Sequence, residues 1–178
     1  MKTKLLLAML LYSGFANSQT YSFTTVTPIP DGSGTSCGSG NTAGSVITTV
    51  AVPLTATITD PTKVTINLDL VHTWLGDIVA QLSKPDGTSC ALIKRMGAAT
   101  DTSCGDSSDF ATGNVLSFNA ANTTTINVVT PGSTQSIPAG SYAPTGGTST
   151  YPTTIPLCNL TTFLNGAAVN GNWSMTFL

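Results

Sequence analysis

Three stretches between residues 63 and 95 alternate apolar and polar side chains, and this period is what most constrains the fold. The first stretch places Val64, Ile66, Leu68 and Leu70 on one face, and the next two stretches cover 78–82 and 89–93. A period of two is typical of a strand with one buried face. Three such strands joined by short turns predict an antiparallel sheet.

Two turns separate these strands. In the first, residues 73–77, we expect Gly76 to adopt a positive φ angle and the Asp77 carboxylate to accept backbone N–H groups. In the second, Pro85 fixes φ, Asp86 supplies a side-chain cap, and Gly87 tolerates the left-handed region. The chain should therefore reverse direction at both places.

The rest of the chain continues the same pattern. Further strands are expected within 46–59, 115–118 and 124–129, whereas the polar stretch 96–113 is a long loop. Thr, Ser, Gly and Val are abundant and good helix formers are few, so almost no helix is expected. The fold class predicted is all-β, a jelly-roll-like β-sandwich of about eight strands.

The block 63–95 resembles the core of the P domain, or Homo B domain, which follows the catalytic domain in kexin- and furin-like convertases and recurs in secreted bacterial proteins. A later block agrees with the resemblance. Phe163 to Gly166 is similar to the family's F-x-G motif, and Asn170 to Phe177 is similar to its N-G-x-W-x-L strand. The motif residues expected to be structural are His72, Trp74, Gly76, Gly166, Gly171 and Trp173.

The resemblance runs from about residue 29 to the end of the chain. Ile29 to Gly32 is similar to the family's entry motif, and 137–144 to its G-x-Y-x-P connector. A further turn and strand that P domains carry after N-G-x-W are missing here. We therefore expect an incomplete C-terminus with an unpaired edge, and interpret the sequence as a fragment of a longer precursor.

The first 18 residues have the pattern of a signal peptide. Lys2 and Lys4 precede an apolar run, 5–11, which is too short to span a bilayer, and a small-x-small site ends at Ser18. The predicted domains are therefore a signal peptide, 1–18, and one β-sandwich domain, 19–178. The protein is expected to be secreted or held at the cell surface, with no membrane span.

Charge is sparse and one-sided. Without the signal segment, four basic residues oppose eight Asp, and Glu is absent. Because no basic patch with interleaved aromatic residues exists, nucleic-acid binding has no electrostatic basis.

Four cysteines in an exported chain predict disulfides, and three pairings are possible. We favour Cys90 with Cys104, because Cys90 lies on a strand and Cys104 in the loop that follows, which leaves Cys37 with Cys158. A zinc site is the alternative, but the chain has no C-x-x-C pair.

Catalysis by this chain is not expected. A Ser-His-Asp triad needs a histidine base oriented by a carboxylate. The chain has one histidine, His72, which lies in the turn motif and is expected to make a structural hydrogen bond. We therefore assign no catalytic residue.

Calcium is the cofactor to consider, since its ligands are oxygens. Asp77 is one candidate ligand, although a role as turn acceptor is favoured, and the candidates in the long loop are Asp101, Asp106 and Asp109. Trp74 and Trp173 suggest a sugar-stacking platform, but Trp173 fits a core position better because it alternates within a strand.

The resemblance implies a non-catalytic accessory domain that stabilises or docks neighbouring domains of an exported, bacterial precursor. The usual parent in this family is a subtilisin-like serine endopeptidase, so the parent of this chain is expected to be a peptidase or an adhesin. A surface-adhesion or glycan-binding module, whose partner is a surface protein or glycan, is the alternative function.

Overall fold

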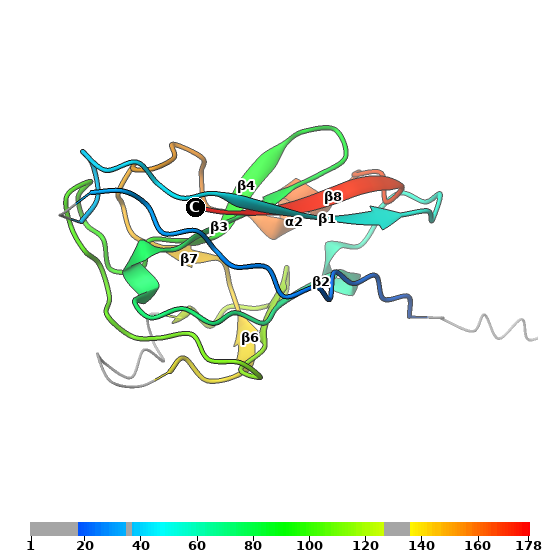
Figure 1. The fold of residues 1–178 in the computed structure, drawn as a ribbon. Coiled ribbons are helices and arrows are strands. Elements are labelled where there is room, and N and C mark those ends of the chain that lie inside the picture. The colour runs from blue at the N-terminus through cyan, green and yellow to red at the C-terminus, as the bar shows by residue number, and fades with distance from the viewer. Residues whose placement is uncertain (1–17, 35–36, 127–135) are drawn as a thin grey trace, which may run out of the picture.

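The computed structural model describes residues 18–34, 37–126 and 136–178, and the eight strands found there form two sheets (Figure 1). The larger sheet has the order β1-β8-β3-β4-β7 and the smaller one the order β2-β5-β6. The strands of the larger sheet are β1 Val46–Val52, β3 Val79–Ser83, β4 Ser89–Lys94, β7 Thr145–Gly146 and β8 Gly171–Phe177. Those of the smaller sheet are β2 Thr65–Leu68, β5 Leu116–Asn119 and β6 Gly140–Tyr142.

This arrangement confirms an all-β sandwich. Helices within the described ranges are short: α2 spans Leu160–Leu164, and two 3-10 turns, η1 and η2, span Pro61–Lys63 and Leu75–Asp77. Asp60 caps η1, because its Oδ1 accepts from Thr62 N at 3.0 Å and Pro61 needs no amide partner at the first helical position.

The hairpin β3–β4 forms as its sequence predicted. Lys84 and Thr88 close the turn with an N–H···O bond of 2.9 Å, Asp86 Oδ1 accepts from Thr88 N at 2.8 Å, and Gly87 has φ +84°. β3 and β4 are buried along most of their length because both lie inside the larger sheet.

The first alternating strand, β2, pairs with β5 in the other sheet rather than with β3. The core lies between the two sheets. Its fully buried side chains include Leu75, Ile78, Leu92, Leu116 and Phe118. The apolar side chains of β2, in the smaller sheet, and those of β3 and β4, in the larger sheet, therefore belong to one core between the two sheets.

The expected strand in 46–59 ends early, at Val52, where Pro53 follows, since proline cannot donate to a ladder. Residues 124–125 are not strand, and 127–129 lie outside the described residues. The late motif gives α2 and then β8. β8 is hydrogen-bonded on both sides, to β1 and to β3, so the long unpaired edge of the larger sheet is β1.

Both disulfides form within the chain, but the favoured pairing was wrong. The bridges are Cys37–Cys104 and Cys90–Cys158, with Cα–Cα distances of 4.8 and 4.9 Å. Cys90 lies near the start of β4, whereas the loop that carries Cys104 leaves from the far end of that strand. Five residues at about 3.3 Å each put roughly 16 Å between these points, which is too far for a disulfide.

Cys90 instead lies beside the segment that carries Cys158. Ala91 N donates to Pro156 O, and Cys158 N donates to Ala91 O, each at 2.9 Å. The segment of Cys37 is joined to the loop of Cys104 by Ser39 N to Asp101 O at 2.6 Å. Each bridge therefore links segments that backbone hydrogen bonds already hold together.

Candidate functional site

The turn of residues 71–77 and the loop of residues 95–110 form the candidate site. Backbone hydrogen bonds join them: His72 and Phe110 exchange two, at 3.3 and 2.8 Å, Leu75 N donates to Ser108 O at 2.6 Å, and Gly76 N donates to Asp106 O at 2.8 Å. The turn is thus fixed along its whole length by the loop.

Gly76 serves a different purpose from the one its sequence context predicted. Its φ is not positive, so the expectation of a left-handed glycine was wrong. A Cβ at this position would lie 2.2 Å from Cys104 O and 2.7 Å from the Gly105 Cα. Glycine is needed here because the turn and the loop approach too closely for a side chain.

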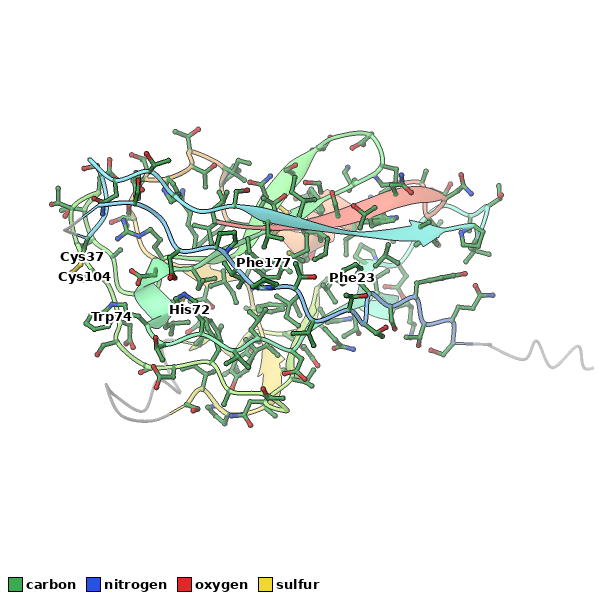
Figure 2. The ribbon with its side chains drawn as sticks, in the orientation of Figure 1. Phe23, Cys37, His72, Trp74, Cys104 and Phe177 are labelled. Carbon is green, nitrogen blue, oxygen red and sulfur yellow. A yellow bond between two sulfur atoms is a disulfide. The ribbon has the colours of Figure 1, made fainter. Side chains whose placement is uncertain are left out.

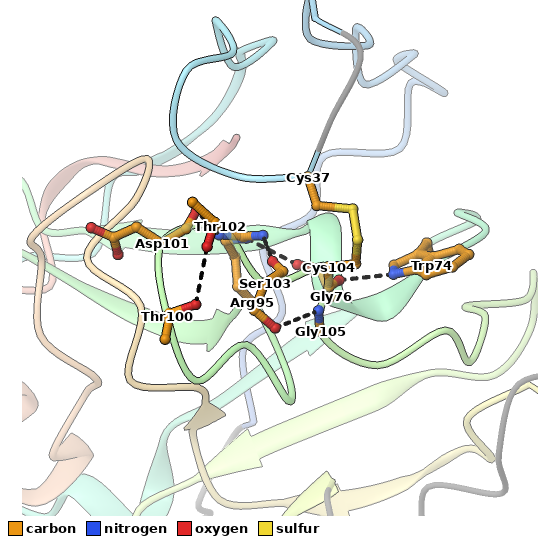
Figure 3. The surroundings of a disulfide bond; sticks show 10 residues. All are labelled: Cys37, Trp74, Gly76, Arg95, Thr100, Asp101, Thr102, Ser103, Cys104 and Gly105. Carbon is orange, nitrogen blue, oxygen red and sulfur yellow. Dashed lines mark hydrogen bonds between the residues drawn. A yellow bond between two sulfur atoms is a disulfide. The ribbon is translucent and has the colours of Figure 1, made fainter.

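The left-handed residue of the turn is Trp74, with φ +85°. Its backbone N–H donates to Asp109 Oδ1 at 3.2 Å, and its indole Nε1 donates to Cys104 O at 2.8 Å (Figure 3). A positive φ is a clear outlier for a bulky side chain. These two hydrogen bonds hold the strained residue in place, and Trp74 is 40% exposed.

Arg95 joins the loop to the turn, and the sequence reasoning missed it. Arg95 is buried, at 2% exposure, and its guanidinium donates to Gly76 O at 3.1 Å and to Ser103 O (Figure 3). It also donates to Ser149 Oγ at 3.1 Å. The Tyr151 ring lies 5.5 Å from it. A basic pair, Lys94-Arg95, at the end of a buried strand in a chain with so few charges was the available signal.

The predicted calcium candidates do not gather at one place. Asp101 Oδ1 accepts from Thr150 N at 2.6 Å and from Tyr151 N at 3.1 Å, Asp106 Oδ1 accepts from Ser108 N at 2.7 Å, and Asp109 binds Trp74 N as described. Within the described ranges, no three His, Cys, Asp or Glu side chains are placed to share a metal ion. Calcium binding stays a prediction.

Hydrogen bonds to the Asp101 carboxylate, from the Thr150 side chain first, lower its pKa to about 2. These bonds favour the charged form. Asp101 therefore links the long loop to residues 149–151 through hydrogen bonds.

Asp77 lies on the wall of a cavity of about 300 Å³. The same cavity is lined by His72, Arg95, Tyr151 and parts of the segment 29–44. No described residue donates a hydrogen bond to the Asp77 carboxylate, so the expected turn-acceptor role was wrong, and Asp109 performs it for Trp74 instead. Burial raises the pKa of Asp77, opposed by the nearby charges of His72 and Arg95.

His72 and Trp74 lie at the same end of the molecule as the Cys37–Cys104 bridge (Figure 2). The structural hydrogen bonds expected of His72 come from its backbone, while its ring Nδ1 is buried with no hydrogen-bond partner among the described residues.

The remaining motif residues lie elsewhere. Trp173, on β8, packs against the core, and its Nε1 donates to Val169 O at 2.8 Å. Gly166 follows α2 with φ +76°, and Gly171 begins β8, where a Cβ would lie 2.7 Å from Pro85 Cβ. The two tryptophans therefore do not share one surface role.

Residues 61–137 match the family model of the proprotein convertase P-domain. The match includes β2, the 71–77 turn, the β3–β4 hairpin and the long loop, whereas the late block with Trp173 lies outside it. No curated protein and no solved structure matches the chain.

Proposed function

We propose that this chain, which carries a proprotein convertase P-domain, serves as the accessory domain of an exported bacterial precursor and docks on a neighbouring domain through its 71–77 turn. A P-domain is non-catalytic and associates with the catalytic domain of its own precursor. The parent is then a subtilisin-like serine endopeptidase, while this chain supplies binding and stability.

The observation that carries the docking proposal is the exposure of two apolar side chains of the turn, Val71 and Trp74, here called the turn surface. Val71 is 65% exposed and Trp74 is 40% exposed, whereas Leu75, which follows Trp74 in the turn, is fully buried. Trp74 also keeps a positive φ, which costs roughly 1–2 kcal/mol for a residue with a side chain. Strain held in place by surrounding structure is characteristic of binding and switch sites.

The turn surface is rigid as well as apolar. Its backbone is fixed by the loop of residues 95–110, and the Trp74 indole is bonded to the carbonyl of Cys104, which the bridge to Cys37 holds in place. An exposed tryptophan held in one conformation loses little entropy on binding and is a frequent hot spot of protein interfaces. We therefore place the centre of the docking interface at Trp74.

The test measures binding of the secreted chain to the catalytic domain of the same precursor by isothermal titration calorimetry. Trp74→Ala should weaken binding about 30-fold, the equivalent of roughly 2 kcal/mol at a hot spot. Leu54→Ala, which removes an apolar side chain of similar exposure after the end of β1, is the control and should leave binding unchanged. Equal affinities of wild type and Trp74→Ala would refute the assignment of this face.

A peptidase assay tests the non-catalytic role separately. The purified chain should cleave neither casein nor dibasic peptides. Cleavage that is lost in a folded His72→Ala variant would overturn the role, because His72 is the sole histidine of the chain.

The setting supported by the family and by two disulfides is extracellular. The described residues contain no helix long and apolar enough to cross a bilayer. The signal peptide stays a prediction, since residues 1–17 lie outside the described part. Adhesion or glycan binding is the second candidate because Trp74 is exposed; glycan-array binding that Trp74→Ala abolishes would favour it.

A further inference from the structure

β1 is an edge strand that has a partner on one side. All seven of its residues pair with β8, from Val46 opposite Phe177 to Val52 opposite Gly171. Along its other edge, no residue in the described ranges makes a backbone hydrogen bond or a bridge to it. Every second residue of β1 thus presents its N–H and C=O groups to solvent.

This edge lacks the devices that normally prevent strands from pairing between molecules. Edge strands are usually short, bulged, or interrupted by lysine or proline. β1 reads VITTVAV, with no charge and no proline, and its pairing with β8 has no register shift. In contrast, β7, at the opposite edge of the sheet, has only two residues. The nearest charged residues along the chain are Asp31 and Asp60.

The strand is also its own complement. An antiparallel copy of β1 with Thr49 opposite Thr49 pairs all seven residues, and Ile47 then lies opposite Ala51. In this register the exposed positions of one copy meet exposed positions of the other, and the half-buried or buried positions on the opposite face meet each other. A shift by one residue would place exposed side chains opposite the core row.

We infer that β1 is a dimerisation edge that pairs antiparallel with β1 of a second copy of this chain, with the two-fold axis at Thr49. Ile47, which is 63% exposed, then packs beside the small Ala51 of the second copy. Neither strand carries a charge that would oppose the approach of an identical strand. A two-fold contact occupies the free edge of β1 in both copies, so no free β1 edge is left for a third copy and assembly stops at the dimer. This inference is independent of the proposed docking role.

The first test is the molar mass of the secreted chain by light scattering after size exclusion, over a range of concentrations. The wild type should approach twice the mass of one chain. Thr49→Lys places two ammonium groups opposite each other at the axis and should raise the dimer dissociation constant at least tenfold. Ser141→Lys, at an exposed position on β6, is the control and should dimerise like wild type.

A monomer at every concentration, a larger open assembly, or a dimer that Thr49→Lys leaves intact would each overturn the inference.

Crosslinking tests the register even if Thr49→Lys is poorly folded. Opposed residues in an antiparallel pair have Cα atoms about 4.5–5.5 Å apart, within the range of a disulfide. Thr49→Cys should therefore give an oxidised dimer on a non-reducing gel. Ile47→Cys is the matched control, because its two copies lie about four residues, roughly 14 Å, apart along the strands. Crosslinking by Ile47→Cys and not by Thr49→Cys would overturn the register.

Discussion

Arg95→Met is the substitution that most directly tests how the 71–77 turn is held. Methionine keeps an apolar stem of similar length but removes every donor. Four hydrogen bonds disappear: to Gly76 O, Ser103 O, Ser149 Oγ and Asp101 O. The last two acceptors keep other donors, since Ser39 N binds Asp101 O and Tyr151 N binds Ser149 Oγ.

Two backbone carbonyls, those of Gly76 and Ser103, are then left without a donor. An unsatisfied buried acceptor costs about 1–3 kcal/mol. Gly76 is buried and Ser103 is half-buried, so we take a cost near the upper end for Gly76 and a smaller one for Ser103, or about 4 kcal/mol for the pair. Removal of a buried charge recovers part of this cost. The expected loss in the free energy of unfolding is therefore about 3 kcal/mol, or roughly 10 °C in Tm for a domain of this size.

The assay is equilibrium unfolding in guanidinium chloride under oxidising conditions, followed by tryptophan fluorescence. Lys63→Met, at the exposed end of η1, removes a charge without a buried network and should stay within about 0.5 kcal/mol of wild type. If Arg95→Met changed the free energy of unfolding by less than about 1 kcal/mol, the guanidinium would not be what holds the turn to the loop.

Three further predictions concern the same region. Gly76→Ala should destabilise the protein by about 3 kcal/mol or more, because its Cβ meets backbone atoms at 2.2 Å. Gly87→Ala is the control: a Cβ there meets open space, and the φ of +84° alone should cost about 1 kcal/mol. If the two variants lost similar stability in thermal unfolding, the close contact of the turn with the loop would not be the reason for glycine at position 76. Because the pKa of Asp101 is lowered to about 2, its contribution to stability should be present above about pH 4 and lost as pH falls toward 2. Asp101→Asn should therefore flatten the curve of stability against pH in this range. An unchanged curve would show that the Asp101 carboxylate does not stabilise the contact between the long loop and residues 149–151. Burial raises the pKa of Asp77, so its charge opposes folding at neutral pH, and Asp77→Asn should not lower the Tm in the absence of calcium. If calcium binds at Asp77, millimolar calcium should raise the Tm of the wild type and leave that of Asp77→Asn unchanged. No shift in the Tm of the wild type would exclude calcium binding at this residue.

The strands could be predicted from the sequence because their signal is local. Alternation around Leu68 and Leu82 identified β2 and β3, and Pro85-Asp86-Gly87 identified the hairpin turn. Which sheet each strand joins was not predictable, since β2 and β3 carry the same alternation and differ only in partners distant in the chain.

The site was harder to predict because its residues act through contacts rather than through motifs. The turn 71–77 was located correctly, but the roles within it were exchanged: Trp74 takes the left-handed conformation expected of Gly76, and Asp109 makes the cap expected of Asp77. Arg95 is defined by carbonyls that only the folded loop brings to it. The disulfide pairing likewise depends on the direction in which β4 runs.

The position of β8 determines when the sheet can form. Because β8 lies between β1 and β3, the sheet requires contacts such as Val46 with Phe177, which lie at opposite ends of the domain sequence. Such distant contacts slow folding. A ribosome or a translocation channel releases residues 171–177 after the other strands of the described ranges, so until then β1 has no neighbour within its sheet and β3 has only β4. A stop codon before Gly171 would remove the strand that joins β1 to the rest of its sheet, and would expose the inner edge of β1 and the facing edge of β3, neither of which carries a charge.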